Sequence, residues 1–228
     1  MKNASARTTY LKDYRSPPFT IETTDLHFDL YEDHACVVSK LLFKRSGGSD
    51  VTSLRLHGQL LKLEKIFING QLVNSDQYIQ DDESLTVPAL DGLLGASFGE
   101  FLFECHTRIE PQKNTALEGL YKSKKMFCTQ CEAEGFRRRT YFPDRPDVLA
   151  RFTTTVRADK ARYPLLLSNG NPVAWGEEEE GGSGRHWVTW EDPFPKPCYL
   201  FALVAGDLAC LEDTFVTVSG RKVALRLY

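Results

Sequence analysis

The segment "TTDLHFDLY" (residues 23–31) alternates between polar and apolar side chains. Leu26, Phe28 and Leu30 would face one side of an extended chain, and the acids and the histidine between them would face the other. This alternation predicts a strand with one buried face. The segment "ACVVSKLLFKR" (35–45) follows closely and is its expected hairpin partner.

The same period of two recurs along most of the chain. Asn69-Gly70 predicts a two-residue hairpin turn, Asn169-Gly170 predicts another tight turn, and "FVTVSGRKVALRLY" (215–228) is a hairpin pattern. No long segment has the spacing of an amphipathic helix. The predicted fold class is therefore mainly β, as an antiparallel β-sandwich or saddle-shaped sheet.

Composition narrows the classes of function and the cell compartments that suit the chain. The chain has 228 residues, 42% of them hydrophobic, which is enough for a core. Its net charge of -3 argues against a nucleic-acid surface, and the basic run at 137–139 is too short to change this. It has no apolar run of about 18 residues and no apolar segment near its N-terminus, so neither a membrane span nor a secretory signal is expected. Six dispersed cysteines indicate free thiols in a reducing compartment, with the cytoplasm as the default.

The acidic segment "GEEEEGGSGRH" (176–186) interrupts the strand pattern. It lacks the alternating Asp spacing of a calcium loop. We therefore expect a solvated hairpin tip there.

Cys128 and Cys131 form a C-x-x-C motif. A structural zinc site needs four ligands, but Cys198 and Cys210 do not form a second close pair and the histidines are isolated. A redox pair would require a βαβ unit, which the pattern does not contain. The residues favour two unpaired thiols on a loop or strand edge. The alternative is that the chain is a small zinc-binding protein that uses Cys128 and Cys131.

Gln130 and Glu132 flank Cys131, and residues two apart in an extended segment point to the same side. A carboxylate beside an amide oxygen suits an ammonium group, because both oxygens accept hydrogen bonds from N–H donors. A structural ion pair between Glu132 and one of the arginines at 137–139 is the competing interpretation. No hydrolase, phosphate-loop or dinucleotide motif occurs elsewhere in the chain.

Four blocks carry a resemblance: "NTALEGLYKS" (114–123), "CTQCEAEGFRRRTYFPDRPDVLARFTT" (128–154), "YPLLLSNGNPVA" (163–174) and "RHWVTWEDPFPKPCYLFALVAGDL" (185–208). They closely resemble the N-terminal domain of the aminopeptidase N family, of the bacterial type. These zinc metallopeptidases remove single residues from peptide N-termini. The resemblance implies a β-rich N-terminal domain that packs against a thermolysin-like catalytic domain.

The family's zinc motif H-E-x-x-H and its G-A-M-E-N segment are absent from this chain. The resemblance therefore implies that the chain is a fragment. The zinc ligands and the catalytic residues would lie beyond Tyr228, and this chain would contain neither. It divides the chain into an N-terminal β-domain (1–207) and the first hairpin of the catalytic domain (208–228). The fragment alone is expected to be inactive. Its implied partners are peptides with a free N-terminus and its own catalytic domain, with no nucleic acid or membrane.

The family's T-Q-x-E segment matches residues 129–132. By resemblance, Glu132 binds the substrate's free α-amine and Gln130 lines the pocket for the first residue. Asp144 and Arg145 are expected to be structural, whereas the GGSG insertion at 181–184 and the arginine run match no family function. A non-catalytic interaction module with the same fold is the alternative function.

Overall fold

The computed structural model describes residues 10–47, 50–96, 98–178 and 184–228. The acidic segment predicted as a hairpin tip lies partly outside these residues, at 179–183. Within the described ranges the fold is mainly β, as predicted, and no helix is both long and apolar enough to cross a membrane.

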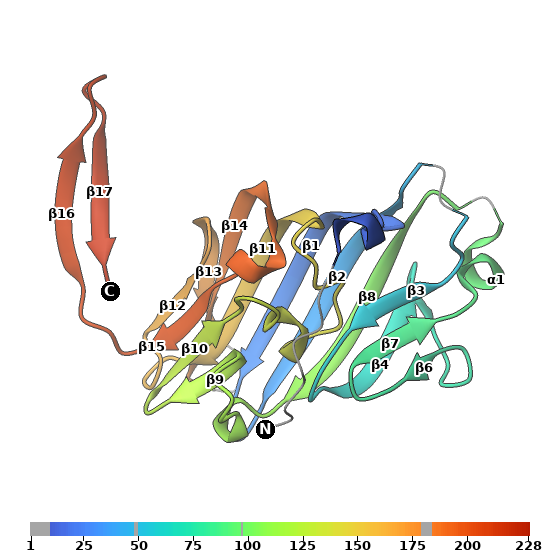
Figure 1. Cartoon of the computed structure of the whole chain (residues 1–228). Helices are drawn as coiled ribbons and strands as arrows, with labels where there is room; N and C mark the ends of the chain where they lie inside the picture. Colours follow the sequence, from blue (N-terminus) through green and yellow to red (C-terminus); the bar gives the residue numbers. More distant parts are fainter. Residues whose placement is uncertain (1–9, 48–49, 97, 179–183) are drawn as a thin grey trace.

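In this part of the chain the strands form one large sheet and three smaller ones (Figure 1). The large sheet has the order β13 (Asn171–Glu177), β14 (Arg185–Pro197), β11 (Leu149–Asp159), β1 (Phe19–Leu30), β2 (Ala35–Arg45), β8 (Glu100–Ile109), β4 (Lys62–Ile68), β5 (Gln71–Leu72). The second sheet is β12 (Leu165–Ser168), β15 (Leu203–Gly206), β10 (Met126–Gln130), β9 (Gly119–Ser123); the third is β3 (Leu54–His57), β7 (Ser84–Val87), β6 (Ile79–Gln80); the fourth is β16 (Leu211–Val216) with β17 (Lys222–Leu227). The helical elements are short: α1 (Leu90–Leu94), η1 (Leu11–Asp13), η2 (Pro111–Lys113), η3 (Phe136–Arg138) and η5 (Cys198–Leu200).

The hairpin predicted from the opening segment is present, because β1 and β2 pair antiparallel with Leu26 opposite Ser39. Leu26, Phe28 and Leu30 are buried as the alternation predicts. One feature differs from the expected antiparallel fold: β1 pairs with β11 in parallel. Side-chain alternation sets which face of a strand is buried, but it does not specify the neighbour or its direction.

The core lies on one face of the large sheet, under the second and third sheets, which cover opposite ends of that face (Figure 1). Between them runs the segment 131–148, and buried hydrogen bonds fix it to the large sheet. The Ser39 and Thr140 hydroxyls are 2.7 Å apart, and the Thr107 hydroxyl donates to the Arg139 carbonyl at 3.1 Å. This segment leads out of β10 and back into the large sheet, so it links the candidate site to the core.

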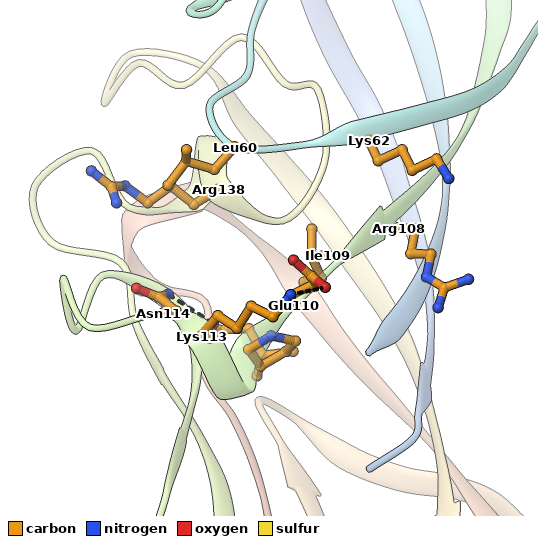
Figure 2. A pocket seen from close by; sticks show the side chains of 10 residues that line it. Leu60, Lys62, Arg108, Ile109, Glu110, Lys113, Asn114 and Arg138 are labelled. Carbon is orange, nitrogen blue, oxygen red and sulfur yellow. Dashed lines mark hydrogen bonds and ion pairs between the residues drawn. The ribbon is translucent and has the colours of Figure 1, made fainter. Parts of the chain in front are cut away.

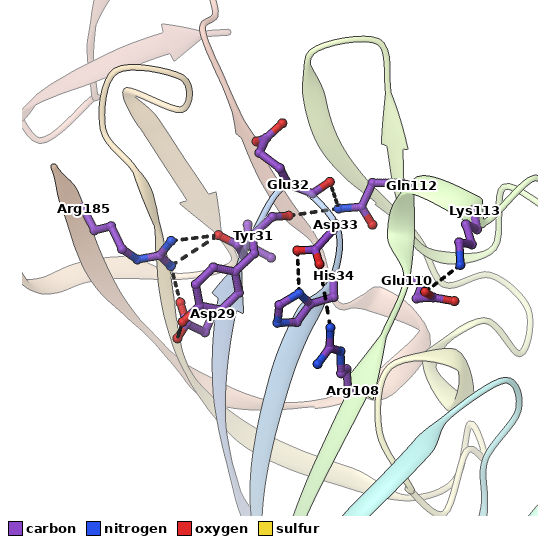
Figure 3. Close-up of polar contacts among 11 residues, drawn as sticks. Asp29, Tyr31, Glu32, Asp33, His34, Arg108, Glu110, Gln112, Lys113 and Arg185 are labelled. Atoms are coloured by element: carbon purple, nitrogen blue, oxygen red, sulfur yellow. Dashed lines mark hydrogen bonds and ion pairs between the residues drawn. The ribbon is translucent and has the colours of Figure 1, made fainter. Parts of the chain in front are cut away.

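A polar network holds the β1–β2 turn against neighbouring strands (Figure 3). Arg185 binds the Asp29 carboxylate and stacks over the Tyr31 ring, and Gln112 donates to the carbonyls of Tyr31 and Glu32. Burial raises the pKa of Asp29, but the hydrogen bonds from Arg157 and Tyr31 and the charge of Arg185 outweigh it and lower that pKa overall. The ionised carboxylate is therefore part of this end of the fold.

The hairpin of β16 and β17 stands apart from the rest of the molecule (Figure 1). Its two strands pair only with each other in the described structure. Apolar side chains such as Leu211, Phe215 and Leu227 are exposed on it. The turn around Ser219-Gly220 joins the two strands, as the sequence predicts.

Candidate functional site

The end of β10 is held on both sides before the chain enters the segment 131–148. On one side Gln130 pairs with Gly119 of β9. On the other, the Thr129 hydroxyl donates to the Leu203 carbonyl at 3.0 Å and accepts from the Leu203 amide at 2.8 Å. A threonine side chain thus extends the contact between β10 and β15 beyond their backbone pairing at Phe127 and Ala205. These bonds fix the position of the residues that follow.

Cys131 anchors the chain immediately after the strand. Its side chain is buried, its thiol donates to the Phe201 carbonyl at 2.8 Å, and Arg139 Nη2 donates to its sulfur at 2.6 Å. Burial raises the pKa of the Cys131 thiol, partly opposed by the Arg139 charge. Cys128 is also buried, in β10, and both thiols are free. The pair therefore lies in the packed interior rather than in an open clip.

No group of three or more His, Cys, Asp or Glu side chains suited to a metal ion occurs among the described residues. The C-x-x-C motif consequently lacks the further ligands that a structural zinc site needs. The residues present here do not fit a zinc ion.

The turn after Cys131 is compact. The Gly135 amide donates to the Cys131 carbonyl at 2.7 Å, and a Cβ on Gly135 would lie 2.4 Å from the Gln130 carbonyl oxygen. Only a residue without a side chain allows this approach. The peptide bond between Glu132 and Ala133 is cis. The turn is thus packed directly against the end of β10.

Gln130 and Glu132 are both exposed, on either side of the buried Cys131, which agrees with the expectation that they share a side. The Gln130 side-chain amide donates to the Glu132 carbonyl at 3.4 Å, so the two residues are adjacent. Gln130 ends the strand and Glu132 begins the turn. The structure brings the two predicted site residues together at one exposed point.

The first arginine of the run pairs with other acids. Arg137 Nε lies 3.0 Å from the nearly buried Asp144 carboxylate, and Arg137 Nη1 lies 3.2 Å from Glu134. The other oxygen of Asp144 accepts a hydrogen bond from the Cys198 thiol at 3.1 Å. Asp144 therefore ties the start of η3 to η5, which agrees with the structural role expected for it.

The remaining arginines are also engaged elsewhere. Arg138 lies 3.1 Å from Glu118 in the loop before β9. Arg139 is fully buried between the rings of Phe136 and Phe201. Glu132 forms no ion pair within the ranges that the structure describes. The competing interpretation, a structural ion pair between Glu132 and an arginine at 137–139, is therefore wrong for these ranges.

Sequence reasoning missed the groups that position this turn. Thr129, Arg139 and Gly135 act through contacts with residues that are distant in sequence or through one close backbone approach. All three stand inside the quoted block (128–154), but no spacing rule identifies their partners. The spacing around Cys131 and the resemblance at 129–132 pointed only to Gln130 and Glu132.

Residues 22–200 match the family model described as the peptidase M1 N-terminal domain. The chain is 51% identical to aminopeptidase N of Haemophilus influenzae and 52% identical to aminopeptidase N of Escherichia coli, over 98% and 96% of its length. In each case it covers 24% of the relative, so the chain spans about a quarter of the length of these relatives.

The fold matches solved structures as well. Legionella pneumophila aminopeptidase A, in complex with aspartic acid, superimposes with a TM-score of 0.86 at 33% identity, over 96% of this chain and 25% of that one. An M1 zinc metallopeptidase of Deinococcus radiodurans superimposes with a TM-score of 0.73 at 17% identity, over 92% of this chain and 47% of that one, which is a likeness of fold alone.

Proposed function

This chain belongs to the family of peptidase M1 N-terminal domains, and from that premise we propose that it is the substrate-anchoring domain of a zinc-dependent aminopeptidase. In this proposal a larger protein, of which the chain is part, removes residues from the N-termini of peptides. The chain contributes recognition, and its own catalytic domain contributes the chemistry. The chain alone then has no peptidase activity.

The observation that carries the proposal is the state of Glu132. Its carboxylate is exposed, it follows a strand end that is fixed on both sides, and it has no cationic partner among the described side chains, although three arginines lie within seven positions of it. A fixed carboxylate without an internal partner is suited to an external cation. The free α-amine of a peptide has a pKa of about 7.7–8.0, so it is largely protonated at neutral pH.

Gln130 is placed to act beside it. Its amide is adjacent to Glu132 and exposed at the same point, so its carbonyl oxygen is available as a second acceptor or as part of the wall around the first residue. Charge-assisted hydrogen bonds to an ammonium group are roughly twice as strong as neutral ones. Anchoring the terminal amine in this way would restrict cleavage to the first peptide bond.

The catalytic zinc is assigned to the larger protein, because the described residues offer no metal-binding group. The relative from Deinococcus radiodurans is itself named a zinc metallopeptidase. We assign residues 1–207 to the N-terminal domain and 208–228 to the catalytic domain as its first hairpin. The separation of β16 and β17 from the other sheets and their exposed apolar side chains support this division. A cytoplasmic location is consistent with six free cysteines.

The test is Glu132→Gln in the full-length protein, assayed with leucine 7-amido-4-methylcoumarin. Loss of one charged contact costs about 2–5 kcal/mol, so kcat/KM should fall roughly 30-fold to several thousand-fold. The unfolding midpoint should not change, because the side chain is exposed.

Glu134→Gln is the matched control. This residue lies in the same turn, is 68% exposed and forms only a surface ion pair with Arg137, so kcat/KM should stay within about threefold of wild type. Activity of Glu132→Gln within twofold of wild type, or an equal loss in both variants, would refute the amine anchor. A full-length protein without any aminopeptidase activity would instead favour the interaction module.

A further inference from the structure

The guanidinium of Arg139 is fully buried, although no carboxylate pairs with it in the described part of the chain. It lies 5.3 Å from the ring centroid of Phe136 and 4.9 Å from that of Phe201. Its Nη2 donates to the Cys131 sulfur at 2.6 Å, whereas its Nε and Nη1 have no acceptor among the described residues. Arginine stays protonated in proteins, and buried charges are normally paired. This buried cation is therefore suited to an anion at the position of the sulfur.

The other two arginines of the run have carboxylate partners. Arg137 lies 3.0 Å from Asp144, and Arg138 lies 3.1 Å from Glu118. Arg138 also lines a cavity of about 600 Å³, away from the buried sulfur (Figure 2). Of the three, Arg139 is the one whose charge faces a thiol.

The two contacts of the Cys131 sulfur respond in opposite ways to a negative charge. As a thiol, the side chain donates to the Phe201 carbonyl at 2.8 Å and accepts from Arg139. Oxidation to a sulfinate would replace the S–H donor by anionic oxygens, which only accept hydrogen bonds. The Phe201 carbonyl would repel these oxygens, whereas the free N–H groups of Arg139 would bind them. Oxidation would thus move Cys131 away from one partner and toward the other.

We propose that Cys131 is an oxidation site for hydrogen peroxide, that Arg139 holds the sulfinate product, and that the change displaces Glu132. The Cys131 thiol loses its proton, the sulfur forms a bond to one peroxide oxygen, and the O–O bond breaks. The products are a sulfenic acid and water. A second peroxide converts the sulfenic acid to a sulfinic acid and water, and the sulfinic acid loses its proton. Each step oxidises the sulfur by two electrons and reduces one peroxide. The oxidation is independent of the proposed function, but its effect through Glu132 rests on it.

The position of Cys131 favours its reaction over that of other buried thiols. It lies directly before residues 132–134, which are exposed, so a molecule as small as peroxide has one turn to pass. Burial raises the pKa of the Cys131 thiol, and the Arg139 charge opposes this by favouring the thiolate that reacts. Burial also raises the pKa of Cys105, to about 12, and no cation opposes it there. Cys131 should therefore oxidise before Cys105.

The first test exposes the full-length protein to hydrogen peroxide and follows each cysteine by peptide mass spectrometry. Cys131 should gain oxygen at least about tenfold faster than Cys105, which corresponds to a pKa difference of about one unit. Arg139→Met removes the charge and should slow Cys131 oxidation by about tenfold or more. Arg138→Met is the matched control, because this neighbouring arginine pairs with Glu118, and it should leave the rate unchanged. Equal rates at Cys131 and Cys105 in the wild-type protein, or an unchanged rate in Arg139→Met, would overturn the proposal.

The second test measures hydrolysis of leucine 7-amido-4-methylcoumarin in the same samples. Activity should fall in parallel with Cys131 oxidation. Cys131→Ser, whose hydroxyl can donate and accept as the thiol does, should keep its own starting activity under the same exposure. Cys128→Ser is the control and should lose activity as the wild type does. An equal loss in Cys131→Ser would overturn the coupling to Glu132. Failure of the amine anchor itself would show in Glu132→Gln and would leave the oxidation rates unchanged, so the two proposals fail separately.

Discussion

Replacing Gly135 by alanine should displace the turn that carries Glu132. The Gly135 backbone has a φ of -80°, which any residue adopts, so the substitution is not strained by its conformation. The obstacle is space: the new Cβ would lie 2.4 Å from the Gln130 carbonyl oxygen and 3.0 Å from the Gly119 amide nitrogen. Ordinary contact begins at 3.4 Å, so the turn and the strand end must separate by about 1 Å.

Overpacking of this kind costs about 1–3 kcal/mol. For a domain of this size each kcal/mol lowers the melting temperature by about 2–4 °C, so Gly135→Ala should melt about 2–12 °C below wild type. In the full-length protein a misplacement of about 1 Å should lower kcat/KM by about 100-fold. Melting by circular dichroism and kinetics on the same substrate as for Glu132→Gln provide the two readouts.

Gly99→Ala is the control, because no atom lies within 4 Å of its would-be Cβ. A glycine replaced by alanine at an unhindered position gains about 0.4–1 kcal/mol through the unfolded state, so this variant should melt at or slightly above wild type. If Gly135→Ala melts within 1 °C of wild type, or rises as Gly99→Ala does, the steric argument for the turn fails.

Three further outcomes are expected. Asp144→Ala should cost about 3–5 kcal/mol in urea unfolding, because it leaves the largely buried Arg137 guanidinium with only the exposed Glu134 as an ion-pair partner; a loss below 1 kcal/mol would contradict this. Asp29 has a lowered pKa in the folded state, despite burial, chiefly through Arg157, so its contribution is present above its unfolded pKa of about 3.9 and is lost as the pH falls through the folded value. The stability gap between wild type and Asp29→Asn should therefore be full at pH 6 and shrink as the pH falls below about 3.9, and a gap independent of pH would refute it. Iodoacetamide at pH 7.5 should label the exposed Cys210 before the buried Cys105, whose pKa burial raises to about 12, as read by mass spectrometry; equal labelling rates would exclude this order.

Local patterns predicted the elements of the fold well. Alternation identified β1 and β2 and their buried faces, and Asn69-Gly70 forms the turn between β4 and β5, with positive φ at both residues. The parallel neighbour of β1 was not predictable, since that pairing depends on contacts between segments far apart in the chain. Asn169-Gly170 is a turn, but it leads from one sheet into another rather than closing a hairpin.

The candidate site was predictable to a similar extent. A period of two predicts that Gln130 and Glu132 share a side, whereas their exposure and the partners of the arginines depend on how segment 131–148 folds back. The pairing of Lys62 with Arg108 in neighbouring strands could not be read from the sequence either. Those residues are forty-six positions apart in the sequence and lie opposite each other only because of the register of β4 and β8, a strand pair that also contains a bulge.

The parallel pairing of β1 also determines when the large sheet can be completed during synthesis. β2 follows β1 closely, but the other neighbour of β1 begins only at Leu149. Synthesis proceeds at about 5–20 residues per second, so the roughly 120 residues between Leu30 and Leu149 take about 6–24 s to be made. During that interval a nascent sheet of β1, β2 and β8 would present β1 as an open edge next to its uncovered apolar face. Such an edge is a template for pairing with other chains, so the period of greatest exposure to aggregation ends with the emergence of β11.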